Sequence, residues 1–388
     1  MKNQTKKHKP FMKRGTIALF SVLLFMVFTT AAWAQSKKLK NVQGIIDKAT
    51  RGHLTGVTVY IKTSEGNEWV GVAGFQDIEN RKPMEAGCVF AAGSVGKMYT
   101  AVAALKLVEQ GKLELDGKIS QYLPEWITTN LPHGQILTVR HLLANQSGLI
   151  NYENDAKLNA LYLSGNLKLD TLTHENVLKR YVFHHPPTGA PGTAYQYSST
   201  NFMLLAMIMD QLTPNGHTEF LRKEVLQAHG FKTTYYRQTP PDHLVNHYGD
   251  LDQDGKVENL TSKTIETTNW FMGDDGIYAP ISEAAHFLET LMGGGILKAE
   301  TLGQMTKWND EKKPDYGLGL MADKSFPYQF LIGHSGRGIG TTTDLFYFPN
   351  QKMTVGIFCN TGIRQTSPVI KKEYLRMRNK IVKKLFLF

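Results

Sequence analysis

Two strand-like apolar runs, residues 55–63 and 67–75, flank the polar turn sequence SEGN and predict a β-hairpin. From residue 94 to residue 110 the apolar positions extend around almost the whole helical circumference, and Gly111 follows as a helix terminator. A helix that is apolar on every side is buried inside a sizeable protein. Ser94 and Lys97 at its beginning are therefore not expected to be ordinary solvated residues.

Residues 113–265 show helical spacing in segments that are joined by loops rich in proline and glycine. Strand-like runs return after about residue 270, and a basic amphipathic helix with proline in its first turn closes the chain. We expect its apolar stripe to pack on a sheet and its Lys and Arg side chains to face solvent. The stripe consists of Val369, Tyr374, Met377, Ile381 and Leu385.

This order of elements predicts an α/β fold of the α+β type. Residues 35–112 and 266–388 would form one α/β part, and residues 113–265 would be inserted into it as a helical lobe. The two parts together make one domain, residues 35–388.

The first 34 residues have the features of a secretory leader. Six basic residues and no acidic residue precede the apolar sequence IALFSVLLFMVF, and Ala32 and Ala34 have the small-x-small spacing of a leader-peptidase site. The apolar run is shorter than the roughly 20 residues that a membrane-spanning helix needs. We therefore expect residues 1–34 to be a cleaved signal peptide, with the periplasm or cell envelope as the destination. The alternative is an uncleaved anchor that tethers the same domain to the inner membrane.

Charge and cysteine content exclude several classes of protein. The leader carries six of the ten net positive charges, so the remaining 354 residues are only mildly basic. Nucleic-acid binding needs basic residues clustered on a folded face, and we expect no nucleic-acid partner. Cys88 and Cys359 are too few for a disulfide scaffold or a Cys-based zinc site. Both lie in apolar runs, which favours two buried free thiols over one bridge.

The sequence AAGSVGKMYTAVAAL, which begins at residue 91, is compatible with a phosphate-binding loop or an activated serine. A phosphate-binding loop has the form G-x-x-x-x-G-K-[ST], but Ala91 and Met98 occupy the first glycine position and the final Ser/Thr position. An α/β-hydrolase elbow has the form G-x-S-x-G, and Ala92 stands at its first glycine position. Both motifs are excluded, which leaves a serine and a lysine with S-x-x-K spacing.

Helical spacing places Ser94 and Lys97 on one face, one turn apart. A serine hydroxyl is a poor nucleophile until a neighbouring base takes its proton. Lysine can be that base only where burial or nearby positive charge lowers its pKa from about 10.4 toward neutrality. The pair alone is a weak signal, because S-x-x-K occurs by chance in most chains of this length.

Further segments resemble the serine β-lactamase/penicillin-binding protein superfamily, of the class C β-lactamase and D-alanyl-D-alanine carboxypeptidase kind. FAAGSVGKMYTAVAAL resembles its nucleophile region, and TVRHLLANQSGL resembles the helix and turn that follow. PGTAYQYSST resembles its Tyr-x-Asn motif, with Tyr197 at the tyrosine position. His334, Ser335 and Gly336 stand where Lys-Thr-Gly or a His-x-Gly variant lies. The resemblance covers about residues 40–365 and implies a β-lactamase/transpeptidase-like fold, an antiparallel sheet flanked by helices plus an inserted all-helical lobe.

The same resemblance implies acyl-enzyme chemistry. Ser94 would attack a carbonyl carbon and become acylated. Lys97 and Tyr197 would share the proton transfer, with Tyr197 as a phenolate that the Lys97 ammonium stabilises. The backbone N–H groups of Ser94 and Arg337 would form the oxyanion hole. No metal and no organic cofactor is implied.

Two positions depart from the family pattern where substrate is held. Ser199 replaces the asparagine of the second motif and has one donor instead of the two of an amide. His334 replaces the lysine of the third motif, which weakens the positive charge near pH 7, although Arg337 could supply that charge instead. We therefore expect the acyl-enzyme chemistry to be preserved, whereas these two positions do not identify the substrate.

Together these features predict an exported serine hydrolase that acts on amides or esters through Ser94. The resemblance favours a D-amino-acid peptide of the peptidoglycan kind as substrate, in a penicillin-binding, carboxypeptidase-like reaction. The alternatives are a β-lactamase or a small-ester esterase of the same fold. An alternative of another class is a non-catalytic protein that binds or senses the cell wall. The intact Ser94, Lys97 and Tyr197 disfavour this last alternative.

The sequence DLDQDGKVE fits the first half of a calcium-binding loop through Asp250, Asp252, Asp254 and Gly255. Its twelfth position is Thr261 where such loops have glutamate, and no helical pattern leads into it. A polar hairpin turn is therefore the favoured interpretation.

Overall fold

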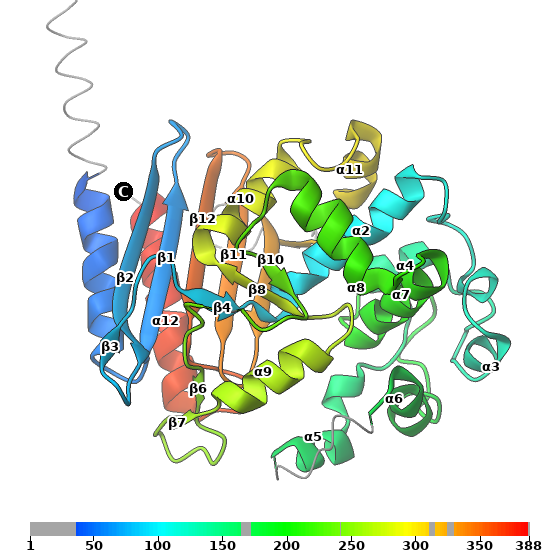
Figure 1. The fold of residues 1–388 in the computed structure, drawn as a ribbon, viewed down its shortest axis with the longest axis horizontal. Helices are drawn as coiled ribbons and strands as arrows, with labels where there is room; N and C mark the ends of the chain where they lie inside the picture. The colour runs from blue at the N-terminus through cyan, green and yellow to red at the C-terminus, as the bar shows by residue number, and fades with distance from the viewer. Residues whose placement is uncertain (1–35, 164–171, 241, 310–314, 324–329, 387–388) are drawn as a thin grey trace, which may run out of the picture.

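The computed structural model is shown in Figure 1. It describes residues 36–163, 172–240, 242–309, 315–323 and 330–386. The predicted signal peptide, residues 1–34, lies outside these ranges. Within them, no helix combines the length and the apolar character that crossing a membrane requires.

The main sheet consists of β1 (Gly56–Lys62), β2 (Glu68–Asp77), β3 (Lys82–Pro83), β9 (Met321–Asp323), β10 (Leu331–Arg337), β11 (Thr342–Phe348) and β12 (Met353–Cys359). Its seven strands are antiparallel and lie in the order β3-β2-β1-β12-β11-β10-β9. The predicted hairpin is confirmed as β1 and β2. The two ends of the chain meet in the centre of the sheet, where Val57 of β1 is paired with Cys359 of β12.

Helices cover both faces of this sheet (Figure 1). The helix at residues 36–50 and α12 (Pro368–Phe386) pack on one face in a core that includes Val42, Ile46 and Tyr374. On the other face lie α10 (Ile281–Met292) and α2 (Gly96–Glu109), which share a second core with the middle of the chain. Every residue of α2 up to Leu105 is buried, as its uniformly apolar circumference predicts.

The middle of the chain contains α3 (Glu125–Thr128), α4 (Val139–Leu143), α5 (Ala156–Leu163), α6 (His174–Tyr181), α7 (Ser199–Leu212), α8 (Gly216–Leu221) and α9 (Thr261–Trp270). It also contains short strands. β5 (Tyr235–Tyr236) joins β4 (Val89–Ala91) and β8 (Ile277–Pro280) in a three-stranded sheet, and β6 (Tyr248–Gly249) pairs with β7 (Glu258–Asn259).

The predicted fold class is confirmed, with one correction. Residues 113–265 are not all-helical, because β5, β6 and β7 lie within them. Strands of two residues are too short to produce an alternating apolar pattern, so periodicity could not predict them.

The apolar stripe of α12 also needs one correction. Pro368 begins the helix as predicted, and four of the five predicted stripe residues are buried. Val369 is 42% exposed, whereas its neighbour Ile370 is fully buried. Ile370 lies one helical turn before Tyr374 and therefore shares its face, which Val369 does not.

The two cysteines are free and buried, as the sequence predicts. Burial raises the pKa of the Cys359 thiol to about 11. Thiols with a raised pKa are poor nucleophiles, so neither sequence nor surroundings give them a chemical role.

Candidate active site

Ser94 lies in η1 (Gly93–Val95), a short 3-10 turn that leads directly into α2. Gly93 has φ +57°, a conformation that glycine adopts without strain. A Cβ atom at Gly93 would lie 3.2 Å from Gly336 Cα and 3.4 Å from the backbone nitrogen of Arg337. The backbone beside the serine is thus packed against β10, with the Arg337 nitrogen close to it.

Lys97 is wholly buried in the first turn of α2. Its ammonium donates hydrogen bonds to Ser94 Oγ at 3.0 Å and to the backbone carbonyl of Asp274 at 2.8 Å. The contact between serine and lysine is the one that helical spacing predicts. Sequence reasoning missed the Asp274 carbonyl, because a backbone acceptor from a distant loop leaves no motif.

The surroundings keep Lys97 charged. Burial lowers its pKa, but the negative charges that Tyr197, Asp274 and Glu153 carry when ionised outweigh burial and raise it. An isolated Ser-Lys pair would need the opposite shift for the lysine to act as base. Burial also raises the pKa of the Asp274 carboxyl, to about 6, and Tyr152 donates to this carboxyl at 2.8 Å.

Tyr197 completes the group that the sequence predicts. Its ring centroid lies 5.0 Å from Lys97 Nζ. Ser198, the next residue, donates its N–H to Asn145 Oδ1 at 3.0 Å, which fixes the backbone just before α7. Burial raises the pKa of Tyr197, while Lys97 and the hydrogen bond from Ser94 pull it down in part. The structure therefore brings together a serine hydroxyl, an ammonium and a phenol.

His334 is neutral and does not face substrate as a cation. It is fully buried, and burial lowers its pKa to about 3. Its Nδ1 lies 2.7 Å from the Ser335 carbonyl, which can only accept, so Nδ1 carries the proton. Nε2 then accepts from Tyr316 Oη at 3.1 Å. The weak positive charge expected at the third motif is absent from this position.

The side chains of Ser335 and Arg337 lie on the other face of β10, under α12. Ser335 Oγ and an Arg337 guanidinium nitrogen each lie 2.6 Å from Asp344 Oδ1. Tyr374 of α12 donates to Asp344 Oδ2 at 2.8 Å. The prediction that the Arg337 side chain supplies charge to a substrate is therefore wrong, because that charge is already paired. Gly336 stays on the serine side, where a Cβ would lie 2.2 Å from the Ala92 carbonyl.

Ser199, the residue at the asparagine position, is buried behind the site. Its hydroxyl donates to Glu153 Oε2 at 3.1 Å, and its N–H donates to Asn151 Oδ1 at 3.2 Å. Glu153 Oε1 also pairs with Arg364 at 3.3 Å. In this structure Ser199 holds a carboxylate in place.

A pocket lies beside Ser94, lined by α9, by the turn between β10 and β11, and by the segment after β12. Apolar walls come from Leu158, Trp270, Phe271 and Ile339. Its polar lining includes Glu153, Arg364 and Asp275, and burial raises the pKa of Asp275 to about 8. These three residues escaped the sequence analysis, since none belongs to a motif. The pocket can receive an apolar group next to the serine hydroxyl.

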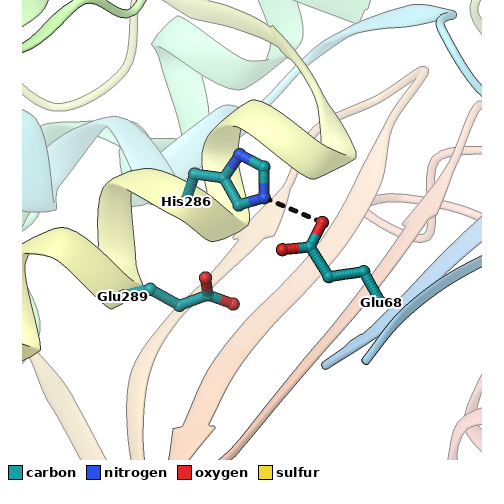
Figure 2. A group of neighbouring side chains, drawn as sticks. All are labelled: Glu68, His286 and Glu289. Carbon is teal, nitrogen blue, oxygen red and sulfur yellow. Dashed lines mark hydrogen bonds and ion pairs between the residues drawn. The ribbon is translucent and has the colours of Figure 1, made fainter. Parts of the chain in front are cut away.

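Two groups of side chains in the described ranges have the spacing of a metal site, and neither lines this pocket. Figure 2 shows one of them, Glu68, His286 and Glu289, between β2 and α10. Lys62 Nζ lies 3.1 Å from Glu68 Oε1 and 2.9 Å from Glu289 Oε2. Lys62 bridges the two carboxylates and His286 Nε2 lies 3.1 Å from Glu68 Oε2, so the cluster works as an ion-pair contact between hairpin and helix.

Comparison with known proteins agrees with this geometry. The family model described as Beta-lactamase matches residues 42–376. Penicillin-binding protein 4* of Bacillus subtilis is 23% identical over 83% of this chain and 71% of its own length.

Solved structures share the fold. The D-amino acid amidase of Ochrobactrum anthropi SV3, in complex with L-phenylalanine amide, superposes with a TM-score of 0.75 at 21% identity, over 90% of this chain and 98% of its own. EstCE1, a hydrolase with promiscuous acyltransferase activity, does so with a TM-score of 0.68 at 24% identity, over 90% of this chain and 99% of its own. With a Ser-Lys-Tyr group at the expected place and a family match over most of its length, the chain belongs to the β-lactamase family of serine hydrolases.

Proposed function

We propose that this protein is an exported amidase that forms an acyl-enzyme at Ser94 with amides of D-amino acids or of short D-peptides. The observation that carries the proposal is the 3.0 Å contact between Lys97 Nζ and Ser94 Oγ, with the Tyr197 ring 5.0 Å from the ammonium, at the edge of a largely apolar pocket. The D-amino acid amidase with the same fold supports this class of substrate.

The charges around the pocket favour an amide over a peptide with a free C-terminal carboxylate. Of the two arginines at this pocket in the described ranges, Arg364 pairs with Glu153, and the guanidinium of Arg337 pairs with Asp344 on the far face of β10. His334 is neutral and bonded to Tyr316. A carboxylate next to the scissile bond would therefore meet no uncommitted cation among the described residues of this pocket, which disfavours the hypotheses of a carboxypeptidase and of a penicillin-binding enzyme.

The proposed reaction begins when the Lys97–Tyr197 pair loses one proton. The pair then accepts the proton of Ser94, and Oγ forms a bond to the substrate carbonyl carbon. The backbone N–H groups of Ser94 and Arg337 would donate to the developing oxyanion. The C–N bond breaks as the pair returns the proton to the leaving amine, and water then hydrolyses the ester on Ser94.

Turnover of D-phenylalanine amide and its L-enantiomer, measured as released ammonia, tests the proposal. We expect turnover of the D-amide, and its loss in Ser94→Ala. Ser335→Ala is a matched control, because this serine lies on the far face of β10 and its loss leaves the pocket unchanged. An inactive but folded wild-type protein whose Ser94 also fails to react with a fluorophosphonate probe would contradict the proposal and support the non-catalytic alternative.

A small-ester esterase is the second candidate. An uncharged acyl group suits a pocket whose arginines are paired, and EstCE1 has the same fold. The ratio of kcat/KM for D-phenylalanine amide and p-nitrophenyl butyrate separates the candidates. Preference for the butyrate by more than about tenfold, without amide turnover, would favour the esterase.

Export to the cell envelope is part of the proposal and rests on the leader sequence and on the penicillin-binding relative. The mass of the protein recovered from the envelope checks it. Cleavage after Ala34 predicts a mature chain that begins at Gln35.

A further inference from the structure

The loop between β6 and β7 brings three aspartates together. One carboxylate oxygen from each of Asp250, Asp252 and Asp254 lies within 4.8 Å of the others. Gln253 and Gly255 have φ +62° and +88°, and these two left-handed residues turn the loop so that alternate side chains converge. The hairpin itself is the turn that the sequence favours, since Gly249 and Glu258 are paired across it.

Asp250 sets this cluster apart from an ordinary polar turn. It is 1% exposed, whereas the other two aspartates are at the surface. Its Oδ2 accepts from the N–H groups of Gly255 and Ser367, each at 3.2 Å. Its Oδ1 is also buried, and no described residue donates to it with ordinary hydrogen-bond geometry; the Ser367 hydroxyl, which lies near the same carboxyl, is itself buried without a partner. A buried carboxylate oxygen without a partner is costly, so this atom calls for a donor or a cation.

The outer carboxylates are available to share such a cation. Asp252 Oδ1 accepts from the Asp254 N–H at 3.4 Å, and Asp254 Oδ1 accepts from the Lys256 N–H at 2.7 Å. Lys256 Nζ lies 3.3 Å from Asp254 Oδ2, but its side chain is 86% exposed. A surface ion pair of this kind contributes little and can be displaced by a bound ion.

We propose that this loop binds one Ca²⁺ ion through Asp250, Asp252 and Asp254. By their spacing these are positions one, three and five of a calcium loop, with Gly255 at position six and the Lys256 carbonyl available at position seven. Clustered carboxylates of irregular geometry suit Ca²⁺ better than Mg²⁺, which demands near-ideal octahedral geometry.

Affinity for calcium is expected to be modest. Thr261 stands at position twelve, and its hydroxyl donates to Asn259, so the bidentate glutamate of a complete loop is missing. The Kd should lie on the order of 10⁻⁴–10⁻³ M, the range of extracellular calcium modules. Such a range suits a protein with a secretory leader.

The ion would stabilise two walls of the active-site pocket without contacting the reacting groups. β7 runs into α9, whose Thr264, Thr267 and Trp270 line the pocket. Ser367, whose N–H binds Asp250, follows the pocket residues Arg364 and Gln365. Two walls of the pocket thus converge on Asp250.

Calcium titration of EDTA-dialysed protein, by calorimetry and by thermal unfolding, tests the proposal without any substrate. In wild type, 10 mM CaCl₂ should raise Tm by about 2 °C, and MgCl₂ should have a smaller effect. The double variant Asp252→Asn/Asp254→Asn changes exposed side chains only and should fold, with the calcium shift lost.

Glu68→Gln is the matched control, since it removes a carboxylate from the other cluster, and it should keep the full shift. A wild-type Tm that is equal in CaCl₂ and EDTA, with no heat of binding, would overturn the proposal. A calcium shift that persists in the double variant would overturn it too. Because neither readout needs turnover, failure here is distinguishable from failure of the proposed amidase activity.

Discussion

At the scale of single residues, Lys97 holds a charge at a point where the reaction needs a base. Its ammonium donates to Ser94 Oγ and to the Asp274 carbonyl, and an ammonium that donates cannot also accept the serine proton. The phenol of Tyr197 is the other group in reach, and burial raises its pKa. The two groups titrate together, so the active form is the pair with one proton removed.

This coupling predicts an alkaline pH dependence. Net effects raise the pKa of both Lys97 and Tyr197, so the pair keeps its proton at neutral pH and loses it as the pH rises. Since the deprotonated pair is the active form, kcat/KM should increase with pH and still be rising at about pH 8. A profile of kcat/KM for D-phenylalanine amide measures this, and a plateau that begins below neutrality would contradict it.

Removing the Tyr197 hydroxyl should impair proton transfer from Ser94 and leave the fold intact. We expect Tyr197→Phe to lower kcat/KM by about 10²–10⁴-fold, the usual contribution of a positioned acid or base. Tyr195→Phe is the matched control, because Tyr195 stacks on the Tyr316 ring at 5.2 Å, whereas the hydrogen bonds of the Lys97 ammonium go to Ser94 and Asp274. Equal losses in the two variants, with unchanged Tm, would show that Tyr197 acts only by packing.

At the scale of elements, the two faces of strand β10 have different roles: one faces the active serine and the other packs under α12. Alternation places His334 and Gly336 toward η1, and it places Ser335 and Arg337 toward α12. A sequence motif does not show which face of a strand each residue occupies. The motif therefore predicted that all of residues 334–337 contact substrate. Register was the missing information, because a strand of this length with both faces covered shows no apolar alternation.

The far face of β10 should therefore govern stability and not catalysis. Burial raises the pKa of Asp344, but Arg337, Arg378 and Ser335 outweigh it and hold that pKa below its usual value. The stability that the ionised Asp344 carboxylate contributes is present above about pH 4 and is lost as the pH falls and the carboxylate is protonated. We expect Asp344→Ala to cost about 3–5 kcal/mol, because it removes the shared acceptor of the Ser335 hydroxyl, the half-buried Arg337 guanidinium and the buried Tyr374 hydroxyl.

Urea unfolding measures this loss, and the milder Ser335→Ala should cost about 1.5–3 kcal/mol for its hydrogen bond to a charged group. KM for the amide should stay unchanged in Ser335→Ala. A raised KM with full stability would return Ser335 to the substrate site.

At the scale of the whole molecule, apolar patterning predicted the layers but not the contacts that cross them. The hairpin, the buried helix α2, the late strands and α12 follow from periodicity, because burial on a face repeats along the chain. Ser94 and Lys97 followed from their S-x-x-K spacing on a buried helix, and Tyr197 followed from a family resemblance. Glu153 and Arg364 lie 211 residues apart, and their pairing depends on the closed fold rather than on any local pattern.

That long-range pair gives the last prediction. Glu153 comes from the middle of the chain, Lys97 from the start and Arg364 from the end, so one carboxylate links three parts of the molecule. Burial lowers the pKa of Lys97, and Glu153 is among the negative groups that raise it. Glu153→Gln removes that negative charge and leaves Arg364 positive, and both changes favour loss of a proton from the Lys97–Tyr197 pair.

In the pH profile of kcat/KM, we therefore expect the rising limb of Glu153→Gln to lie at lower pH than that of the wild type. The variant should have higher relative activity near pH 7. Asp116→Asn is the matched control: this carboxylate also pairs with an arginine, Arg140, but it is 72% exposed, so its loss should leave the limb in place. A limb that stays fixed or moves to higher pH in Glu153→Gln would mean that Glu153 does not act on the pair. The pKa of the Lys97–Tyr197 pair would then be set by α2 and its immediate contacts, and not by the Glu153–Arg364 pair that joins distant parts of the chain.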